Sequence, residues 1–141
     1  MPVKAIHHVD LAVRDVERSL AFYLGVLGPL GVKEDCRFRS YRGTEEVVYL
    51  SIGDQLLGLR PADGGAHHYY EVGLEHLAFL VDRRQDVDDA YARCVELGVE
   101  VHFPPEEDRD LPGYWELFVF DPDGMRIEVA YFPCDAARER S

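Results

Sequence analysis

Two histidines and one glutamate in this 141-residue chain have the types and spacing of metal ligands. His8 and His76 occupy matching places in two segments, 6–15 and 74–83, that align at an offset of 68 residues (76 minus 8). In both segments apolar and polar residues tend to alternate, as they do in half-buried strands. Glu128 lies in a further run with the same alternation. Imidazole and carboxylate groups that converge from separate strands are suited to a divalent ion such as Fe, Mn or Zn.

The repeat also distinguishes between the adjacent histidines His7 and His8, of which only one can share a face with His76. At the same offset Glu75 matches His7 and His76 matches His8, and the apolar positions of the two strands then agree. We therefore predict that His8, His76 and Glu128 bind the metal and that His7 lies outside the ligand set.

The elements that must position these residues follow the same order in both halves of the chain. In each half a strand leads into an amphipathic helix, which begins after an N-cap such as Asp15 and ends at a glycine, and three further strands follow. The expected elements are strands over 5–13, 32–41, 45–52, 55–60, 73–82, 99–103, 114–120 and 125–132, with helices over 16–27 and 85–97. The pattern predicts an α+β fold of two strand–helix–strand–strand–strand modules, whose sheets curl around a cleft.

The length of the chain is typical of one domain. The predicted boundaries are 1–133 for the domain, 3–62 for the first module, 63–71 for the linker, 72–133 for the second module and 134–141 for a polar tail.

Composition excludes several classes of partner. The formal net charge of -12 argues against nucleic acid and anionic membranes, which attract basic surfaces. No apolar run approaches the roughly 18 residues of a membrane span, and no signal peptide is expected. Cys36, Cys94 and Cys134 form neither a metal-binding pair nor a disulfide framework, with Cys94 on an apolar helical face. These features are typical of a cytoplasmic protein.

The motifs, in their order, resemble the vicinal oxygen chelate superfamily, which includes glyoxalase I, bleomycin-resistance proteins, fosfomycin-resistance enzymes and extradiol dioxygenases. The resemblance covers about residues 3–133. It is carried by Ile6-His7-His8-Val9, by the segment 14–23, by Glu75-His76-Leu77-Ala78-Phe79 and by the segment 121–129, which begins Asp-Pro-Asp-Gly.

The resemblance implies one metal ligand on the first and one on the last strand of each module. His8, His76 and Glu128 occupy three of these four positions. The fourth falls at Gly58, which has no side chain to offer, so that glyoxalase I activity is disfavoured and Gly58 becomes a candidate substrate contact.

Three ligands leave open positions for a small oxygenated substrate that the metal chelates. Among the possible activities, that of a dioxygenase is narrowly favoured over that of a lyase, isomerase or thiol transferase. The alternative is a metal-free protein of the bleomycin-resistance type, which sequesters a small ligand. Substrate, reaction and native metal remain open.

Four more residues are candidates for the site. The substrate-binding candidate Asp10 and the catalytic and substrate-binding candidate Arg126 share the predicted cleft face. Arg126 either binds an anionic substrate there or forms a salt bridge to Asp10 or an acidic neighbour. The segment 104–115 is either a flap over the cleft, with the catalytic candidate Tyr114 and the substrate contact Trp115 lining a flat substrate, or a solvated loop that its aromatics anchor.

The expected assembly is a homodimer. Curled four-stranded sheets leave exposed edges, and the resemblance implies that two chains pair to cover them.

Overall fold

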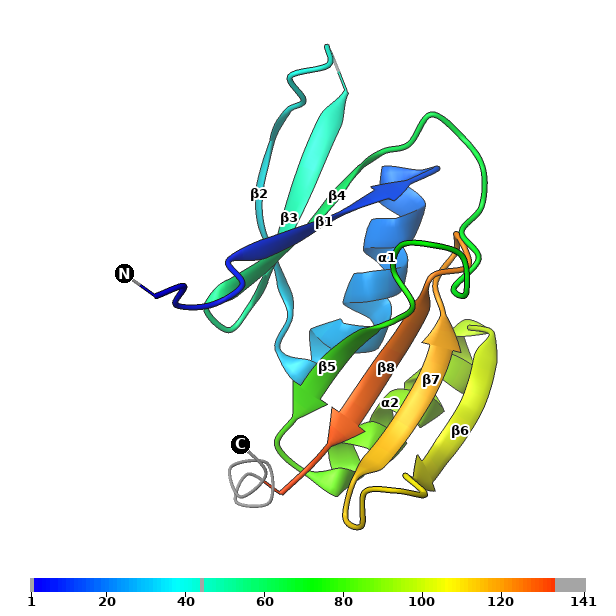
Figure 1. Ribbon diagram of the computed structural model, residues 1–141. Coiled ribbons are helices and arrows are strands. Elements are labelled where there is room, and N and C mark those ends of the chain that lie inside the picture. Colours follow the sequence, from blue (N-terminus) through cyan, green and yellow to red (C-terminus); the bar gives the residue numbers. More distant parts are fainter. Residues whose placement is uncertain (1, 44, 134–141) are drawn as a thin grey trace. The chain divides into compact units, whose positions relative to one another are not determined.

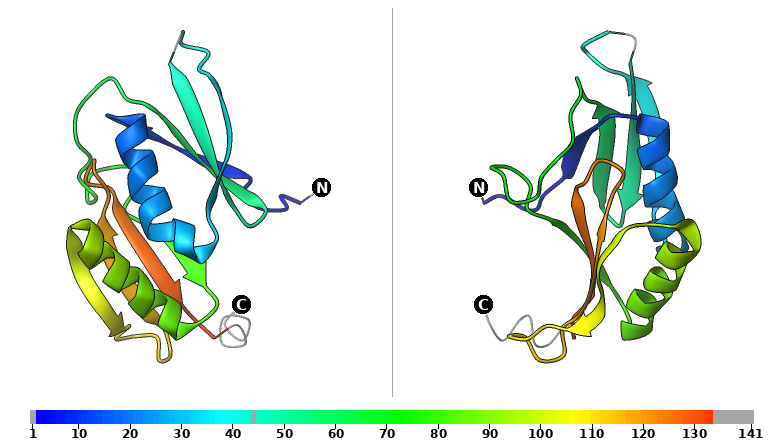
Figure 2. Two further views of the ribbon diagram at one scale, coloured as in Figure 1. Left: turned by 180° about the vertical axis from the view of Figure 1, so that it is seen from behind. Right: turned by 90° about the vertical axis from the view of Figure 1, so that its right-hand side faces the viewer.

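The computed structural model describes residues 2–43 and 45–133. The chain divides into two compact units, Met1–Ala66 (unit 1) and His67–Ser141 (unit 2). Each unit has one four-stranded mixed sheet with a helix packed on one face (Figures 1 and 2). The predicted α+β fold of two strand–helix–strand–strand–strand modules is confirmed. The predicted polar tail, with Cys134, lies outside the described residues. No helix within the described ranges is long and apolar enough to cross a membrane.

Unit 1 has the strand order β1-β4-β3-β2, in which β1 and β4 are parallel and the other pairs are antiparallel. Helix α1 begins where predicted, because the Asp15 side chain accepts a hydrogen bond of 3.0 Å from the Arg18 backbone N–H. The apolar residues Leu20, Tyr23, Val26 and Leu27 of this helix are buried, and so are Leu11 and Val13 of the first strand. The elements are β1 (His8–Val13), α1 (Val16–Leu27), the 3-10 helix η1 (Gly28–Leu30), β2 (Lys33–Arg39), β3 (Glu46–Ile52) and β4 (Gln55–Pro61).

Unit 2 repeats this topology with the order β5-β8-β7-β6. Helix α2 ends at Gly98, which takes the left-handed conformation at φ 68° that a glycine adopts without strain. Val87 and Cys94 on its inner face are buried, as their spacing predicts, whereas Val95 at the edge of that stripe is exposed. The elements are β5 (Leu77–Val81), α2 (Arg84–Leu97), β6 (Val101–Glu107), β7 (Trp115–Phe120) and β8 (Arg126–Tyr131).

The turn between β7 and β8 sets the position of Glu128 on the last strand. The Asp121 side chain accepts hydrogen bonds from the backbone N–H groups of Asp123 and Met125, at 2.9 and 2.8 Å. Gly124 has a φ of 86°, a conformation that favours glycine. The turn chemistry predicted for this tetrapeptide is therefore confirmed, and it places Glu128 two residues inside the strand.

The strand boundaries that differ most from those predicted are the start of β5 and the end of β6. Strand β5 begins at Leu77 rather than at residue 73, so that His76 lies immediately before the strand. Strand β6 continues to Glu107 and includes Pro104 and Pro105, which belong to the segment 104–115 expected to be a flap or a solvated loop. Prolines are tolerated here because β6 is an edge strand and its pairing with β7 shifts register between Phe103 and Glu106.

Candidate metal centre

His76 and Glu128 of unit 2 meet on the sheet face opposite α2. Glu128 lies in β8 across from Ala78 of β5 and Phe118 of β7. Strand alternation directs the neighbours of Glu128 toward the helix and Glu128 itself to the other face, where its side chain is only 4% exposed. His76 precedes β5 and directs Nε2 at Glu128 Oε2, at a distance of 3.3 Å. The structure thus brings together two of the three predicted ligands.

The other ring nitrogen of His76 is bound by a neighbouring carboxylate. One oxygen of Glu75 accepts a hydrogen bond from His76 Nδ1. The other oxygen forms an ion pair with Arg126. Burial alone would raise the pKa of Glu75, but His76 and Arg126 outweigh it and lower that pKa. The sequence left open whether Arg126 binds a substrate or forms a salt bridge. In the structure it forms a salt bridge to an acidic neighbour. The partner is Glu75 rather than Asp10.

Two groups surround the remaining oxygen of Glu128. The Tyr114 hydroxyl donates a hydrogen bond of 3.0 Å to Oε1, and the Glu116 carboxyl group lies beside the same carboxylate. Burial and the charge of Glu128 raise the pKa of Tyr114, which therefore keeps its proton and donates. Burial and Glu128 also raise the pKa of Glu116 to about 8. Glu116 was not predicted from the sequence, although it lies two residues after Tyr114 and so shares its face of the extended segment.

The facing atoms of His76 and Glu128 fit a shared cation. A carboxylate can only accept, so the contact with Glu75 requires a proton on Nδ1, and Nε2 is the His76 atom that faces Oε2. Two ligand atoms that are each about 2.0–2.2 Å from one ion, at ordinary coordination angles, are about 3–3.5 Å apart. The 3.3 Å separation is in that range. No group of three His, Cys, Asp or Glu side chains in the described residues stands ready to hold an ion.

The third predicted ligand, His8, is the first residue of β1 in unit 1. Its Nδ1 lies 2.9 Å from Nδ1 of His7, and its ring meets the ring of Tyr49 edge-on at 5.9 Å between centroids. In a pair of neutral imidazoles only one Nδ1 can donate to the other. In such a pair the Nε2 of His8 is therefore unprotonated only when its own Nδ1 is the donor.

Gly58 lies under the carboxylate of Asp10. The two residues face each other in the parallel β1–β4 pair, and a Cβ at residue 58 would lie 2.2 Å from Asp10 Oδ1. Tyr49 Oη and Arg60 Nε each lie 2.9 Å from Asp10 Oδ2 and hold the carboxylate in place. The position that lacks a ligand side chain is thus covered by a carboxylate from the adjacent strand. The sequence did not indicate the roles of Tyr49 and Arg60.

Trp115 points to the opposite face of the sheet from Glu128. Its indole N–H donates a hydrogen bond of 2.9 Å to Asp88 of α2, and the Arg84 guanidinium lies 3.7 Å from the ring centroid. The expectation that Trp115 and Tyr114 line one surface is therefore corrected. Adjacent residues in an extended segment point to opposite faces, and only Tyr114 reaches Glu128.

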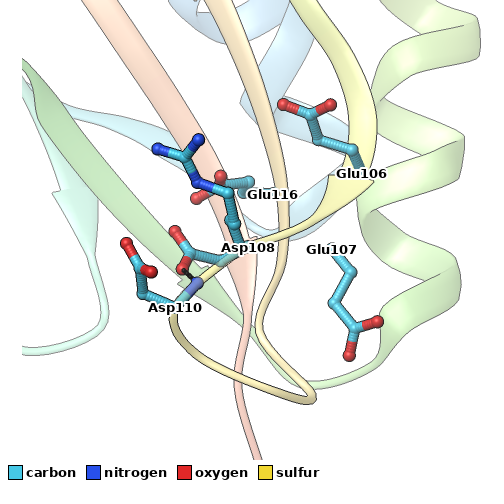
Figure 3. Close-up of a pocket in the computed structure, with 6 residues that line it drawn as sticks. Glu106, Glu107, Asp108, Asp110 and Glu116 are labelled. Carbon is cyan, nitrogen blue, oxygen red and sulfur yellow. Dashed lines mark hydrogen bonds between the residues drawn. The ribbon is translucent and has the colours of Figure 1, made fainter.

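An acidic pocket of about 370 Å³ opens next to Glu116 (Figure 3). The loop between β6 and β7 forms much of its wall, and the Asp110 backbone N–H donates to Asp108 at 2.8 Å. Besides Glu116, its lining residues are Glu106, Glu107, Asp108, Arg109 and Asp110. The segment 104–115 therefore consists of the end of β6, this acidic loop and the first residue of β7.

Comparison with known proteins identifies the family. Residues 5–129 match the Glyoxalase/Bleomycin resistance protein/Dioxygenase superfamily. The chain belongs to this superfamily. Among its relatives is the uncharacterized protein YwkD of Bacillus subtilis, which is 30% identical over 92% of this chain and 98% of its own length.

Two characterised members of the superfamily are also similar. Catechol-2,3-dioxygenase of Bacillus subtilis is 28% identical over 88% of this chain, although the match covers 40% of that protein. The metallothiol transferase FosB of Staphylococcus haemolyticus is 24% identical over 90% of this chain and 83% of its own length.

Solved structures of superfamily members share the fold. A glyoxylase/bleomycin resistance protein/dioxygenase domain from Frankia sp. EAN1pec has a TM-score of 0.80 and 28% identity, covering 94% of this chain and all of that domain. A mutant of the fosfomycin resistance protein FosX from Listeria monocytogenes, complexed with Mn(II) and 1S,2S-dihydroxypropylphosphonic acid, has a TM-score of 0.74. At 18% identity over 97% of this chain and 99% of FosX, that likeness concerns the fold alone.

Proposed function

We propose that this protein is a metal-dependent enzyme that acts on a small oxygenated substrate. His76 and Glu128 of unit 2, with His8 of unit 1 as the third ligand, would hold one divalent ion, Fe, Mn or Zn. The observation that carries the proposal is the Nε2 of His76 facing Glu128 Oε2 at 3.3 Å. The inclusion of His8 rests on the repeat and on the superfamily pattern.

The bound ion would polarise two neighbouring oxygens of the substrate. The residues around it have distinct tasks. Tyr114 donates to Glu128 and so holds the carboxylate with Oε2 toward His76. Glu116 lies beside Glu128, where its carboxyl group could transfer a proton to a substrate oxygen. In unit 1, Asp10 with Tyr49 and Arg60 presents polar groups on the strand face that carries His8.

Within this class we favour a lyase or group-transfer reaction over ring cleavage, which reverses the order expected from the sequence. The reason is the extent of the matches, since FosB is matched over 83% of its length and catechol-2,3-dioxygenase over 40%. Dioxygenation is the second candidate, because a three-ligand set leaves room for both substrate and dioxygen.

The test is metal content by mass spectrometry on protein purified without chelator or nickel. We expect about one Fe, Mn or Zn per chain in the wild type and none in His76→Ala or Glu128→Gln. His68→Ala, which changes an exposed histidine of unit 2, is the matched control and should keep its metal.

The metal then directs the assay. Iron with dioxygen uptake on catechols would select the dioxygenase, whereas manganese or zinc with thiol addition or elimination would select the lyase or transferase. Absence of metal from the wild type after anaerobic reconstitution would overturn the proposal. Retained ligand binding in that protein would support the sequestering alternative.

We also propose that the protein assembles as a homodimer. Every residue of the edge strand β2 is exposed, including Phe38, and an unpaired sheet edge favours association with another chain. Light scattering at micromolar concentration should give about twice the mass of one chain. The mass of a single chain at that concentration would contradict the proposal.

A further inference from the structure

A continuous polar chain in unit 2 leads from Arg126 through Glu75 to His76 and Glu128. We propose that Glu75, held by Arg126, is a positioning residue that sets the tautomer and ring orientation of His76 for metal binding. The inference rests on the proposed function, because it concerns how one of the proposed ligands is prepared. Glu75 itself does not touch the ion.

The chemistry of the Glu75–His76 contact determines the tautomer. An ionised carboxylate has acceptor atoms only, so the hydrogen bond at Nδ1 requires the proton to be on Nδ1. In neutral imidazole the lone pair is then on Nε2, the atom directed at Glu128 Oε2. A carboxylate behind a metal-bound histidine also makes the ring a stronger donor to the metal.

Glu75 is itself fixed by a buried cation. The side chain of Arg126 is only 11% exposed. Its guanidinium lies 4.7 Å from the ring centroid of Tyr69 and 4.6 Å from that of Phe118. Two aromatic faces restrict the guanidinium to the position from which it binds the second oxygen of Glu75.

Phe118 links this support to the ligand pair. Its ring meets the His76 ring edge-on, with 5.5 Å between centroids, and Phe118 lies directly across from Glu128 in the β7–β8 pair. The orientation of His76 is therefore restricted from both sides, by the carboxylate at Nδ1 and by the aromatic ring.

Unit 1 lacks this support at the matching place. The residue that corresponds to Glu75 is His7, and it meets His8 through a contact between two Nδ1 atoms. An imidazole partner allows either ring to be the donor, whereas a carboxylate allows only one arrangement. The positioning device is specific to unit 2.

Two measurements on full-length Glu75→Ala test the inference. The first is Zn(II) affinity, measured by competition with a chromophoric chelator. We expect a 10- to 100-fold loss, roughly the cost of removing an outer-shell partner of a metal-bound histidine. The second is the tautomer of His76 in metal-free protein, read from the ¹⁵N shifts of its ring. We expect wild type to carry the proton on Nδ1 and the variant to have a substantial fraction on Nε2.

Three further variants make the test specific. Glu75→Gln retains an acceptor oxygen and should lie between wild type and Glu75→Ala in both measurements, and it replaces Glu75→Ala if that variant does not fold. Arg126→Lys keeps the charge but not the planar group and should cause a smaller loss. Glu71→Ala removes an exposed carboxylate from the same segment and should match wild type.

The outcomes separate the two proposals. Wild-type affinity and tautomer in both Glu75 variants would overturn the positioning role while leaving the metal site intact. A wild type that binds no metal, yet shows the tautomer change in Glu75→Ala, would overturn the proposed function and keep the role of Glu75 toward His76. No metal and no tautomer change would overturn both.

Discussion

The two units share one topology but place their carboxylates on different strands. In unit 1, β1 has Asp10 and the facing residue of β4 is Gly58, whereas in unit 2, β5 has Ala78 and the facing residue of β8 is Glu128. Each parallel pair thus combines one acidic residue with one small residue. A second side chain has no room across from Asp10, as the contact at Gly58 demonstrates.

The surroundings of the two carboxylates differ in charge. Asp10 is neutralised within unit 1, where Arg60 and Tyr49 bind it. Glu128, in the part of the chain that the structure describes, instead meets Tyr114, Glu116 and the Nε2 of His76. The same fold therefore has an internally satisfied carboxylate in one unit and a carboxylate suited to an external cation in the other.

The largest expected difference between the units concerns metal binding. His76→Ala and Glu128→Gln should each reduce metal occupancy below detection, because they remove one of two ligands that already face each other. His8→Ala should retain measurable occupancy, since the preformed pair survives. Calorimetric titration with Mn(II) and Zn(II) compares the three variants, and equal losses would contradict a metal centre built mainly on unit 2.

Gly58→Ala should destabilise the protein. The new Cβ would lie 2.2 Å from Asp10 Oδ1 and 2.8 Å from Tyr49 Cε1, and overpacking of this kind costs about 1–3 kcal/mol. Urea unfolding measures the loss. The double variant Asp10→Ala/Gly58→Ala should lose less than the sum of the two single variants, because it removes the clash, and strict additivity would show that Asp10 does not restrict residue 58.

Tyr114→Phe and Trp115→Phe compare the two faces of the unit 2 sheet. Each variant removes one hydrogen bond to a carboxylate, worth roughly 1.5–3 kcal/mol of unfolding free energy. Only Tyr114→Phe should also weaken metal binding, since Trp115 binds Asp88 on the helix face. Similar metal affinities for both variants would argue against a role for Tyr114 in holding Glu128.

The smallest effect should appear in the pH dependence of the metal-free protein. Folding raises the pKa of Glu116 from 4.5 to about 8, so that between these values the native state keeps a proton which the unfolded chain has released. The contribution of Glu116 to the free energy of unfolding is therefore largest below its unfolded pKa and is lost as the pH rises through about 8.

Glu116→Gln keeps the shape without titrating. Its melting temperature should exceed that of wild type by several degrees near pH 8.5 and approach it near pH 5. Glu71→Gln, at an exposed carboxylate that does not line the pocket, is the control. A constant difference between Glu116→Gln and wild type across this pH range would contradict the raised pKa.

Local patterns were sufficient to predict most of the fold. The helix start at Asp15, the helix end at Gly98 and the turn before β8 depend on interactions within a few residues of each other, which sequence displays directly. Strand ends were less predictable. The continuation of β6 through Pro104 and Pro105 depends on its place at the sheet edge, which no local pattern reveals.

Periodicity and repeat spacing are properties of the chain alone, so they were enough to predict the repeat, the α+β modules, the superfamily and the candidates His8, His76 and Glu128. Which side chains support these candidates became clear from the folded structure. Arg126 binds Glu75 rather than Asp10, Asp10 covers Gly58, and Trp115 packs toward α2. These contacts depend on strand register and on the face each residue takes, and both are set when distant segments pair.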